Sequence, residues 1–390
     1  GILAAVAFVY APGLVGPMVF DDITNIVFVP NVRITELTYQ TLLGAATAVP
    51  QGPLGRPLAF ITFALNHYFT GINPYYFKLT NLVIHLVVAW LLFLLAIRLL
   101  SNQPGTPLLS RRQAWVALFA FAIWALHPLN LTSVLYVVQR MTSLASLFTV
   151  AGLLGYVIGR QQLVRGTKWG FLTIFFSLAV FGALATLVKE NGVLIVTYAL
   201  AIEAVFFRLA VSPNFSWQGR LFLLSLFVVP IVAAVLVLLM KFDTLAGAAA
   251  YASRPFTLDE RLLTQARALL FYLRLIVIPD TMSLGLYHDD FVVSESLSSP
   301  PSTLAAVFGI VGLSGLALAT IRRASILSFG ILWFLAGHLI ESTIIPLELV
   351  HEHRNYLPSF GIVLAVVYYV LHPNADNLIK PALRYGALTI

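Results

Sequence analysis

The chain of 390 residues contains no cysteine, and only 10% of its residues are charged. The lack of cysteine excludes a disulfide framework, a thiolate metal site and a cysteine nucleophile. The scarcity of charge excludes an ordinary soluble domain, in which about 25% of residues carry a charge. Because hydrophobic residues make up 59% of the sequence, we expect a lipid bilayer to solvate most of the chain.

Basic residues outnumber acidic ones, which gives the chain a net charge of +7. A protein that binds nucleic acid gathers its basic residues on one face or along one helix. Here the basic residues are spread through many loops rather than gathered on one face, so we expect no nucleic-acid partner. We attribute these residues to the orientation of the chain in a membrane.

Apolar runs with close to the roughly 20 residues that a membrane-crossing helix needs recur along the whole chain. We predict spans at 2–20, 79–100, 114–132, 141–159, 170–187, 193–211, 221–240, 303–321, 327–345 and 358–371. Residues 1–372 are therefore expected to form one all-α polytopic membrane domain. Residues 373–390 are expected to form a cytoplasmic tail that leads into a further span at Tyr385, in a sequence trimmed at both ends.

The orientation of these spans follows from lysine and arginine, which collect in cytoplasmic loops. Alternate loops carry basic residues and only one acid, Asp376; the basic residues are Arg98, Arg111, Arg112, Arg160, Arg165, Lys168, Arg208, Arg220, Arg322, Arg323, Lys380 and Arg384. The opposite face then carries both long loops, 21–78 and 241–302, and most of the acidic residues. We expect the chemistry of the protein on that outer face.

Two parts of the outer loops are predicted to be helices that do not cross the membrane. In the first loop, stretches near 33–46 and 57–69 have the apolar periodicity of helices that lie in the membrane interface. Residues 258–279 are long enough to cross, but they carry three arginines. A crossing there would also reverse the charge bias of the loops that follow, so we interpret 258–279 as an outer-face or re-entrant helix.

Two adjacent acids, Asp21 and Asp22, follow the first span at its outer end. A carboxylate that is half desolvated at the interface has a raised pKa and is a better base than one in bulk water. The pair is therefore a candidate for removing a proton from an acceptor hydroxyl. The alternative is a solvated helix cap formed by Asp22 or Thr24.

Several cations are expected on the outer face close to membrane depth, where charge is unfavourable and usually marks a functional cavity. Our candidates for holding a lipid phosphate are Arg56, Arg140, Lys189 and Arg354. An arginine fork can grip two phosphate oxygens, whereas a lysine acts as a point charge. The alternative for a single cation is snorkelling of its head group to the interface, which we expect for Lys78.

Further polar residues are expected around the same cavity. His127 lies near the outer end of a span, either on the cavity rim or satisfied within the core. Glu190 could neutralise Lys189. His351 and His353 suggest a metal site, but on a helix they would point apart and no third ligand is evident, so no metal is predicted.

Seven short motifs occur in a characteristic order along the chain. They are Phe20-Asp21-Asp22, Gly55-Arg56-Pro57-Leu58, Asn81 with His85, His127-Pro128, Gln139-Arg140, Lys189-Glu190 and Glu352-His353-Arg354-Asn355-Tyr356-Leu357-Pro358-Ser359. In this order they resemble the transmembrane and tetratricopeptide-repeat family of protein O-mannosyltransferases, in its bacterial branch. The segment from Arg254 to Asp290 is similar to the central luminal region of that family.

The resemblance implies a type C glycosyltransferase fold of ten to eleven transmembrane helices in a bacterial inner membrane, with the active site on the periplasmic side. It implies a catalytic pair at Asp21 and Asp22, a polyprenyl-phosphate-linked sugar as donor, a protein or glycan as acceptor, and membrane lipids as surroundings. Tetratricopeptide repeats are expected beyond the last span. Residues expected to support the cavity are His85, His127, Glu190, Arg267, Glu352 and Tyr356.

This chemistry requires no cofactor, because arginines can stabilise the departing phosphate. Asp21 or Asp22 could nevertheless recruit a divalent metal. Asn130 departs from the family pattern, which has a second histidine at that position, so no role is assigned to it. The bacterial branch is poorly defined in its substrate, and mannose is therefore not assumed.

Two other classes of function are open at this point. An oligosaccharide polymerase or ligase of the cell envelope would also hold a lipid-linked glycan with outer arginines, but it would not depend on Asp21 and Asp22. A transporter or a non-enzymatic assembly subunit would carry charged residues at mid-membrane and broken helices. Only Glu203, Glu341 and His338 are candidates for such intramembrane positions.

Overall fold

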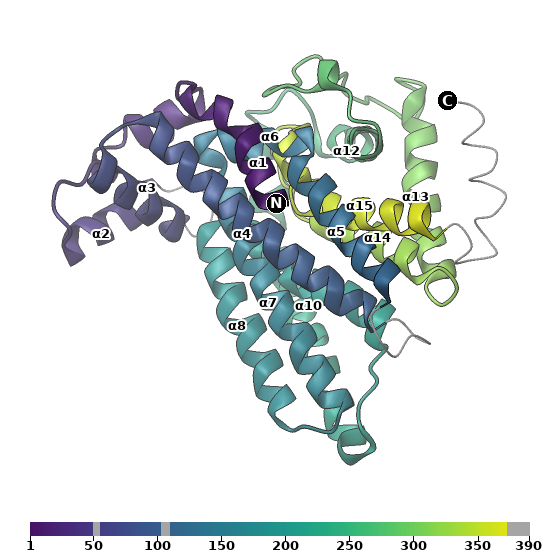
Figure 1. Ribbon diagram of the computed structural model, residues 1–390. Coiled ribbons are helices and arrows are strands. Elements are labelled where there is room, and N and C mark those ends of the chain that lie inside the picture. Colours follow the sequence, from purple (N-terminus) through teal and green to yellow (C-terminus); the bar gives the residue numbers. More distant parts are fainter. Residues whose placement is uncertain (50–54, 103–109, 373–390) are drawn as a thin grey trace. The chain divides into compact units, whose positions relative to one another are not determined.

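The computed structural model describes residues 1–49, 55–102 and 110–372, and the regular elements in these ranges are all helices (Figure 1). The predicted tail at 373–390, with the expected span at Tyr385, lies outside the described residues. Within the described residues, six helical segments are long and apolar enough to cross a membrane. They contain α4 Pro74–Leu100, α7 Arg140–Val164, α8 Trp169–Val188, α9 Ile195–Ile202, α10 Ser216–Ala246 and α13 Ser302–Thr320.

The other predicted spans are present as bent or shorter helices. α5 (Arg111–Leu126) continues into η4 (Pro128–Asn130) and α6 (Leu131–Leu135) through a bend of 53°. The bend falls at Pro128, which has no N–H for the helical ladder. The shorter apolar helices are α1 Ile2–Tyr10 with η1 Ala11–Val15, α14 Ser325–His338 and α15 Pro358–Leu371. Each predicted span thus has a helical counterpart, and the chain is an all-helical polytopic membrane protein as predicted.

Short turns connect these helices. They are η2 Ile23–Val27, η3 Pro30–Val32, η5 Val137–Gln139, η6 Glu190–Leu194, η7 Glu203–Phe207, η8 Pro213–Phe215, α11 Ala248–Tyr251, η9 Thr281–Ser283 and η10 Glu352–Asn355. The predicted helices of the first outer loop are present as α3 (Pro57–Thr70) and as α2 (Tyr39–Ala46), which begins later than the predicted stretch near 33–46. Ala45 and Ala64 of these helices pack together with Ile34 in a small apolar core. Their depth in the membrane interface stays a prediction.

Two predicted spans are shorter in the structure than in the sequence interpretation. The segment expected at 2–20 stops being helical after Val15, because Gly16 is extended with a ψ of 158° and a proline follows it. The segment expected at 327–345 stops being helical at His338. Main-chain carbonyls beyond that point, including those of Glu341 and Thr343, accept hydrogen bonds from an arginine side chain instead of continuing the helix.

The chain divides into two compact units. The first contains Gly1–Leu95, Ala122–Leu163 and Thr167–Ile195; the second contains Ala96–Phe121, Val164–Gly166 and the described residues from Val196 onward. In the first unit α7 and α8 lie side by side (Figure 1) and meet at Gly159 and Gly170. A Cβ atom on Gly170 would lie 2.6 Å from the carbonyl oxygen of Gly159. Small residues at such contacts let membrane helices approach closely.

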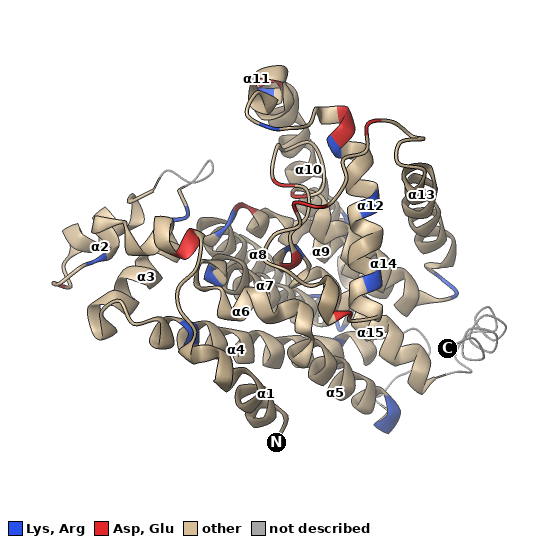
Figure 2. Ribbon diagram, turned by 90° about the horizontal axis from the view of Figure 1, so that it is seen from above, with Lys and Arg blue, Asp and Glu red and all other residues tan. Residues whose placement is uncertain are grey.

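In the second unit α14 and α15 lie side by side (Figure 1), and α12 (Leu258–Val277) packs on α13 and α15. α12 is not among the described helices that are apolar enough to cross a membrane. Figure 2 shows its basic residues at intervals along its length. Arg261, Gln265 and Tyr272 lie on its buried face. A re-entrant path for α12 stays a prediction.

Candidate functional site

The carboxylate of Asp22 is completely buried in the first unit. Its Oδ1 atom accepts a hydrogen bond from the main-chain N–H of Val138 at 2.7 Å, and its Oδ2 atom accepts from those of Val19 at 3.2 Å and Val137 at 3.4 Å. Burial raises the pKa of Asp22 to about 6, although these N–H groups and the charge of Lys78 favour the ionised form. The alternative of a solvated cap at Asp22 is therefore wrong.

The neighbouring side chain of Asp21 is exposed. Its main-chain N–H donates to the hydroxyl of Tyr136 at 3.0 Å. Phe20, just before it, has a φ of 46°, which is strained for a residue with a Cβ atom. No described residue donates a hydrogen bond to the Asp21 carboxylate. Asp22 and Tyr136 thus hold the main chain in place while the carboxylate of Asp21 stays open to solvent.

The guanidinium of Arg140, predicted on the outer side of the membrane, is fully buried in the first unit. Its Nε atom donates to Oδ1 of Asn81 at 2.7 Å, and its terminal nitrogens donate to the carbonyls of Thr62 at 3.0 Å and Phe77 at 2.9 Å. Its Cζ atom lies 4.8 Å from the ring centroid of Phe63, a cation–π contact. Arg140 therefore joins α3, α4 and α7; its role in phosphate binding stays a prediction.

Arg56 precedes α3 in the left-handed region, with a φ of 52°. Its side chain is 24% exposed, and one terminal nitrogen lies 3.0 Å from Oε2 of Glu190. Its Nε atom donates to both oxygens of the same carboxylate at 3.2 and 3.3 Å. The acid that was expected to neutralise Lys189 is thus engaged by Arg56, at the edge of the first unit.

Lys189 lies at the break between α8 and η6 and is nearly buried. Its Nζ atom donates to the hydroxyl of Thr142 at 3.2 Å, and this hydroxyl donates to Oε1 of Gln139 at 2.9 Å. Gly192 allows the tight reversal here, because a Cβ atom on it would lie 2.2 Å from main-chain atoms of α8. The first unit therefore brings Arg56 to the Lys189-Glu190 pair.

The two histidines predicted for the cavity lie in the interior of the first unit. Nε2 of His85 lies 2.9 Å from the carbonyl oxygen of Ala125, and its ring centroid lies 5.2 Å from that of Trp124. His127 is 6% exposed, and its Nδ1 atom accepts from the main-chain N–H of Leu129 at 3.2 Å. This geometry supports the interpretation of His127 as a satisfied core residue.

Arg354, the fourth predicted phosphate ligand, lies in the second unit and is 5% exposed. Its terminal nitrogens donate to the carbonyls of Leu349 at 3.1 Å and Glu348 at 2.8 Å, and its Nε atom lies 3.9 Å from Oε2 of Glu341. Arg261 donates to the carbonyl of Glu341 at 2.7 Å. Burial and the charge of Arg354 lower the pKa of Arg261 to about 10. The two arginines together hold the irregular segment after α14.

Glu352 has a buried carboxylate whose Oε1 atom accepts from the main-chain N–H of Gly285 at 2.6 Å and lies 3.3 Å from Nε2 of His288. It thereby fixes the loop after α12. Arg267, also predicted for the cavity, donates to the carbonyl of Val292 at 2.6 Å in the same loop. The sequence interpretation missed His288, because nothing near it in the sequence indicates a partner 64 residues away.

His351 and His353 do not point apart, because Glu352 and His353 belong to the 3₁₀ turn η10 rather than to an α-helix. Their ring centroids lie 5.0 Å apart with an angle of 27° between the planes. Among the described residues, no group of three or more histidine, aspartate or glutamate side chains could hold a metal ion. Tyr356, which follows this turn, is fully buried.

Lys78 does not snorkel toward the interface as predicted, because its side chain is only 5% exposed. Its Nζ atom donates to the carbonyl of Gly16 at 2.9 Å, and its charge favours the ionised form of Asp22. Lys78 therefore belongs to the surroundings of the acidic pair. It lies 62 residues from Gly16 in the chain, a separation that no local sequence signal can bridge.

The chain is similar to several curated proteins named protein O-mannosyl-transferases. It is 29% identical to Protein O-mannosyl-transferase TMTC1 of Homo sapiens over 221 residues, which are 54% of this chain and 24% of that protein. It is 30% identical to Protein O-mannosyl-transferase TMTC3 of Mus musculus over 209 residues, 52% of this chain and 21% of that protein. The match thus spans about a quarter of the length of these relatives. No family model and no solved structure matches the chain.

Proposed function

We propose that this relative of the protein O-mannosyl-transferases is an inverting glycosyltransferase with a type C glycosyltransferase-like helical fold. It moves a sugar from a polyprenyl-phosphate donor to a hydroxyl group of a protein or glycan, on the periplasmic side of a bacterial inner membrane. The observation that carries the proposal is the exposed carboxylate of Asp21, on a main chain that is held by the buried anchor Asp22 and by the hydroxyl of Tyr136. The charge bias of the loops supports the outer position of this acid.

Asp21 is the catalytic base in this reaction. Its carboxylate takes the proton of the acceptor hydroxyl while the hydroxyl oxygen attacks the anomeric carbon of the donor sugar. The bond between that carbon and the phosphate oxygen breaks, its electron pair leaves with the lipid phosphate, and the configuration inverts in this single displacement. Asp22 is a positioning residue, because three main-chain N–H groups already occupy its carboxylate.

Arg56 and Lys189 stabilise the negative charge that grows on the departing phosphate. The fork of Arg56 is partly exposed and is aligned by Glu190 before a donor arrives. Lys189 follows α8 and directly precedes Glu190 in the chain, and it adds a point charge. A well-placed donor of this kind contributes about 3 kcal/mol to stabilising a transition state. Arg140 and Arg354 support the fold, because their terminal nitrogens donate to main-chain carbonyls.

The test is sugar transfer by the purified chain in phospholipid vesicles, with polyprenyl-phosphate mannose as donor and a peptide containing serine and threonine as acceptor. Asp21→Asn is expected to lower kcat by about 100-fold or more, because a positioned base contributes at least that much. Its thermal unfolding in detergent is expected to match that of the unmodified protein. Glu36→Gln, which changes another exposed acid of the same loop, is the matched control and is expected to retain full transfer.

Other outcomes separate the competing functions. Full sugar transfer by Asp21→Asn would exclude Asp21 as the catalytic base. Transfer only from a lipid-pyrophosphate oligosaccharide, with Asp21→Asn fully active, would place the chain among polymerases and ligases. Arg56→Lys keeps the charge but loses the fork, and it is expected to raise the KM for the donor. An unchanged KM in this variant would exclude Arg56 from phosphate binding.

A further inference from the structure

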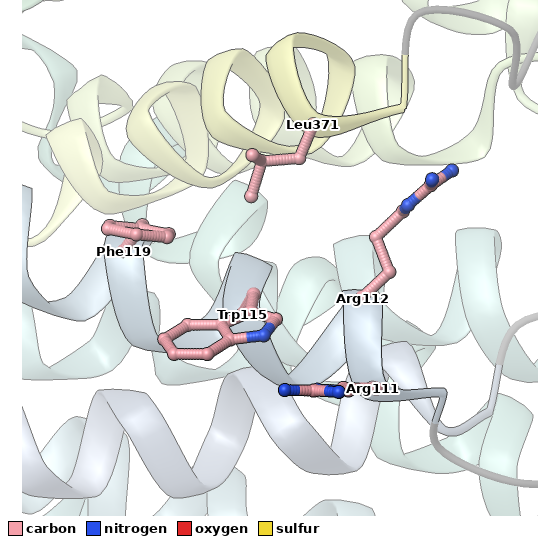
Figure 3. A pocket seen from close by; sticks show the side chains of 5 residues that line it. All are labelled: Arg111, Arg112, Trp115, Phe119 and Leu371. Carbon is pink, nitrogen blue, oxygen red and sulfur yellow. The ribbon is translucent and has the colours of Figure 1, made fainter.

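A groove in the second unit lies between the beginning of α5 and the end of α15, with a volume of about 650 Å³. Arg111, Arg112, Trp115 and Phe119 line it from α5, and Leu371 lines it from α15. Figure 3 shows Leu371 opposite the two aromatic rings, with both arginines toward the beginning of α5. None of these residues takes part in the sugar transfer proposed above.

The walls of the groove are apolar. The rings of Trp115 and Phe119 stack with centroids 5.8 Å apart, and the two side chains are 44% and 45% exposed. α5 is the first part of a candidate membrane span, so exposed rings on it face acyl chains rather than water. Water gains no hydrogen bonds along such walls, so an acyl chain covers them more favourably than water does.

The charged end of the groove contains two cations and no acid among its lining residues. The guanidinium groups of Arg111 and Arg112 are both exposed, and no described residue forms a hydrogen bond or an ion pair with either of them. Burial and the charge of Arg112 lower the pKa of the nearby His372, although a hydrogen bond with the carbonyl of Tyr368 opposes this shift. This end of the groove therefore attracts an anion.

A reciprocal cap fixes the direction in which α5 begins. The main-chain N–H of Gln113 donates to Oγ of Ser110 at 3.1 Å, and that of Ser110 donates to Oε1 of Gln113 at 2.9 Å. Nε2 of Gln113 also donates to the carbonyl of Leu100, the last residue of α4, at 3.1 Å. The main chain at Arg111 and Arg112 is thereby held in place before any ligand binds.

We propose that this groove binds one anionic glycerophospholipid. Its phosphate lies against Arg111 and Arg112, and one acyl chain lies along Trp115, Phe119 and Leu371. A soluble anion would leave the apolar walls uncovered, and a zwitterionic lipid would leave the paired positive charge uncompensated. The charge bias of the loops predicts that this end of α5 faces the cytoplasm, the side opposite to the one predicted for Asp21.

The test measures which lipids the whole chain retains, by native mass spectrometry after reconstitution in equal amounts of phosphatidylglycerol and phosphatidylcholine. The unmodified protein is expected to retain phosphatidylglycerol preferentially. The double variant Arg111→Gln with Arg112→Gln is expected to bind this lipid about 30-fold more weakly, because each arginine near an anionic head group contributes roughly 1 kcal/mol.

Two further variants separate the groove from general positive charge. Arg322→Gln with Arg323→Gln removes another adjacent, exposed arginine pair outside the groove and is expected to leave retention unchanged. Leu371→Trp fills the groove but keeps both arginines, and it is expected to abolish retention of phosphatidylglycerol. If the Arg111 and Arg112 double variant aggregates, Leu371→Trp carries the test.

Several results would overturn the proposal. Equal losses in the two arginine double variants would mean that overall charge, and not the groove, retains the lipid. Equal retention of both lipids by the unmodified protein would remove the preference for an anionic head group. Unchanged retention in Leu371→Trp would place the lipid elsewhere. A preference for undecaprenyl phosphate over phosphatidylglycerol would replace the glycerophospholipid by a polyprenyl phosphate as the occupant of the groove.

Discussion

Oδ1 of Asp22 and the main-chain N–H of Val138 are 2.7 Å apart, although 116 residues separate them in the chain. This hydrogen bond ties the loop after the first helix to the turn that precedes α7. Asp21, one residue earlier, is left with an exposed carboxylate. The two neighbouring aspartates thus differ in position: the carboxylate of Asp22 is bonded inside the fold, and that of Asp21 lies at its surface.

The burial of Asp22 predicts that stability falls as pH rises from about 4 to about 6. The pKa of this carboxyl is about 6 in the folded protein against a reference value of 3.8, so between these values the folded state keeps a proton that the unfolded state has lost. The stabilisation is complete below the lower value and is lost above the higher one, a difference of about 3 kcal/mol.

Thermal unfolding in detergent between pH 4 and pH 8 checks this prediction. Asp22→Asn is expected to remove the pH-dependent part of the unfolding midpoint in that range. An equal pH dependence in the variant and the unmodified protein would assign the effect to another group.

Arg140→Lys is expected to destabilise the protein even though it conserves the charge. A lysine cannot reach Asn81, Thr62 and Phe77 at once in the geometry of the guanidinium fork. Each buried acceptor left without a donor costs about 1–3 kcal/mol. The unfolding midpoint in detergent measures this loss. Arg165→Lys, at an exposed arginine, is the control and is expected to change stability by less than about 0.5 kcal/mol.

A different result would change the role of Arg140. If Arg140→Lys keeps the stability of the unmodified protein but no longer binds the donor, this arginine contacts the phosphate directly. The hydrogen bonds to α3 and α4 would then have to rearrange when the donor binds.

Gly192→Ala is expected to disturb the junction between α8 and η6, where Lys189 and Glu190 lie. A Cβ atom on Gly192 would lie 2.2 Å from the main chain at Ala185 and Thr186, so the main chain must shift. Overpacking of this kind costs about 1–3 kcal/mol. Urea or thermal unfolding measures the loss in free energy of unfolding. The rate of sugar transfer shows whether Lys189 has been displaced.

The matched control for this substitution is Gly312→Ala in α13. A Cβ atom there meets nothing within 4 Å, and alanine favours a helix more than glycine does. Its stability is expected to be unchanged or slightly higher. If Gly192→Ala and Gly312→Ala lower the free energy of unfolding by similar amounts, the close contact at Gly192 is not the cause of the destabilisation.

Glu352→Ala is expected to loosen the loop after α12. The change removes the buried acceptor of the Gly285 N–H and the partner of His288, which costs about 1–3 kcal/mol. Hydrogen exchange of residues 281–292 is expected to become faster. Glu348→Ala removes an ion pair with Arg254 in which the carboxylate is 54% exposed, so its effect is expected to stay below about 1 kcal/mol. If residues 281–292 exchange equally fast in Glu352→Ala and Glu348→Ala, Glu352 does not hold the loop after α12 in place.

The helical membrane architecture was predictable from the sequence because hydropathy is a local property. The span at 358–371 has the same bounds in the sequence interpretation and in α15. Errors arose where the chain changes direction, as after Val15 and His338. There, a proline or a distant arginine side chain decides whether the helix continues.

The candidate site was predictable only as a set of residue types. Sequence reasoning identified Asp21 and Asp22 as acids at the outer end of the first span and Arg56 as a cation of the first outer loop, but it could not tell a buried carboxylate from an exposed one. It also named Arg140 as a cation near the cavity, but it could not show that this side chain is fully buried between three helices. Burial depends on neighbours that are far away in the chain, and a single sequence carries no record of those neighbours.

The sequence by itself determined that this protein is helical, where its spans lie and how positive charge is divided among its loops. These properties depend on the free energy of each segment in water and in lipid, which is set by the residues of that segment. Only the tertiary structure decided that Arg56 meets Glu190, that Arg140 joins three helices and that Asp22 is buried beside an exposed Asp21. Each of these depends on hydrogen bonds and ion pairs between distant segments, which form only once the helices have packed.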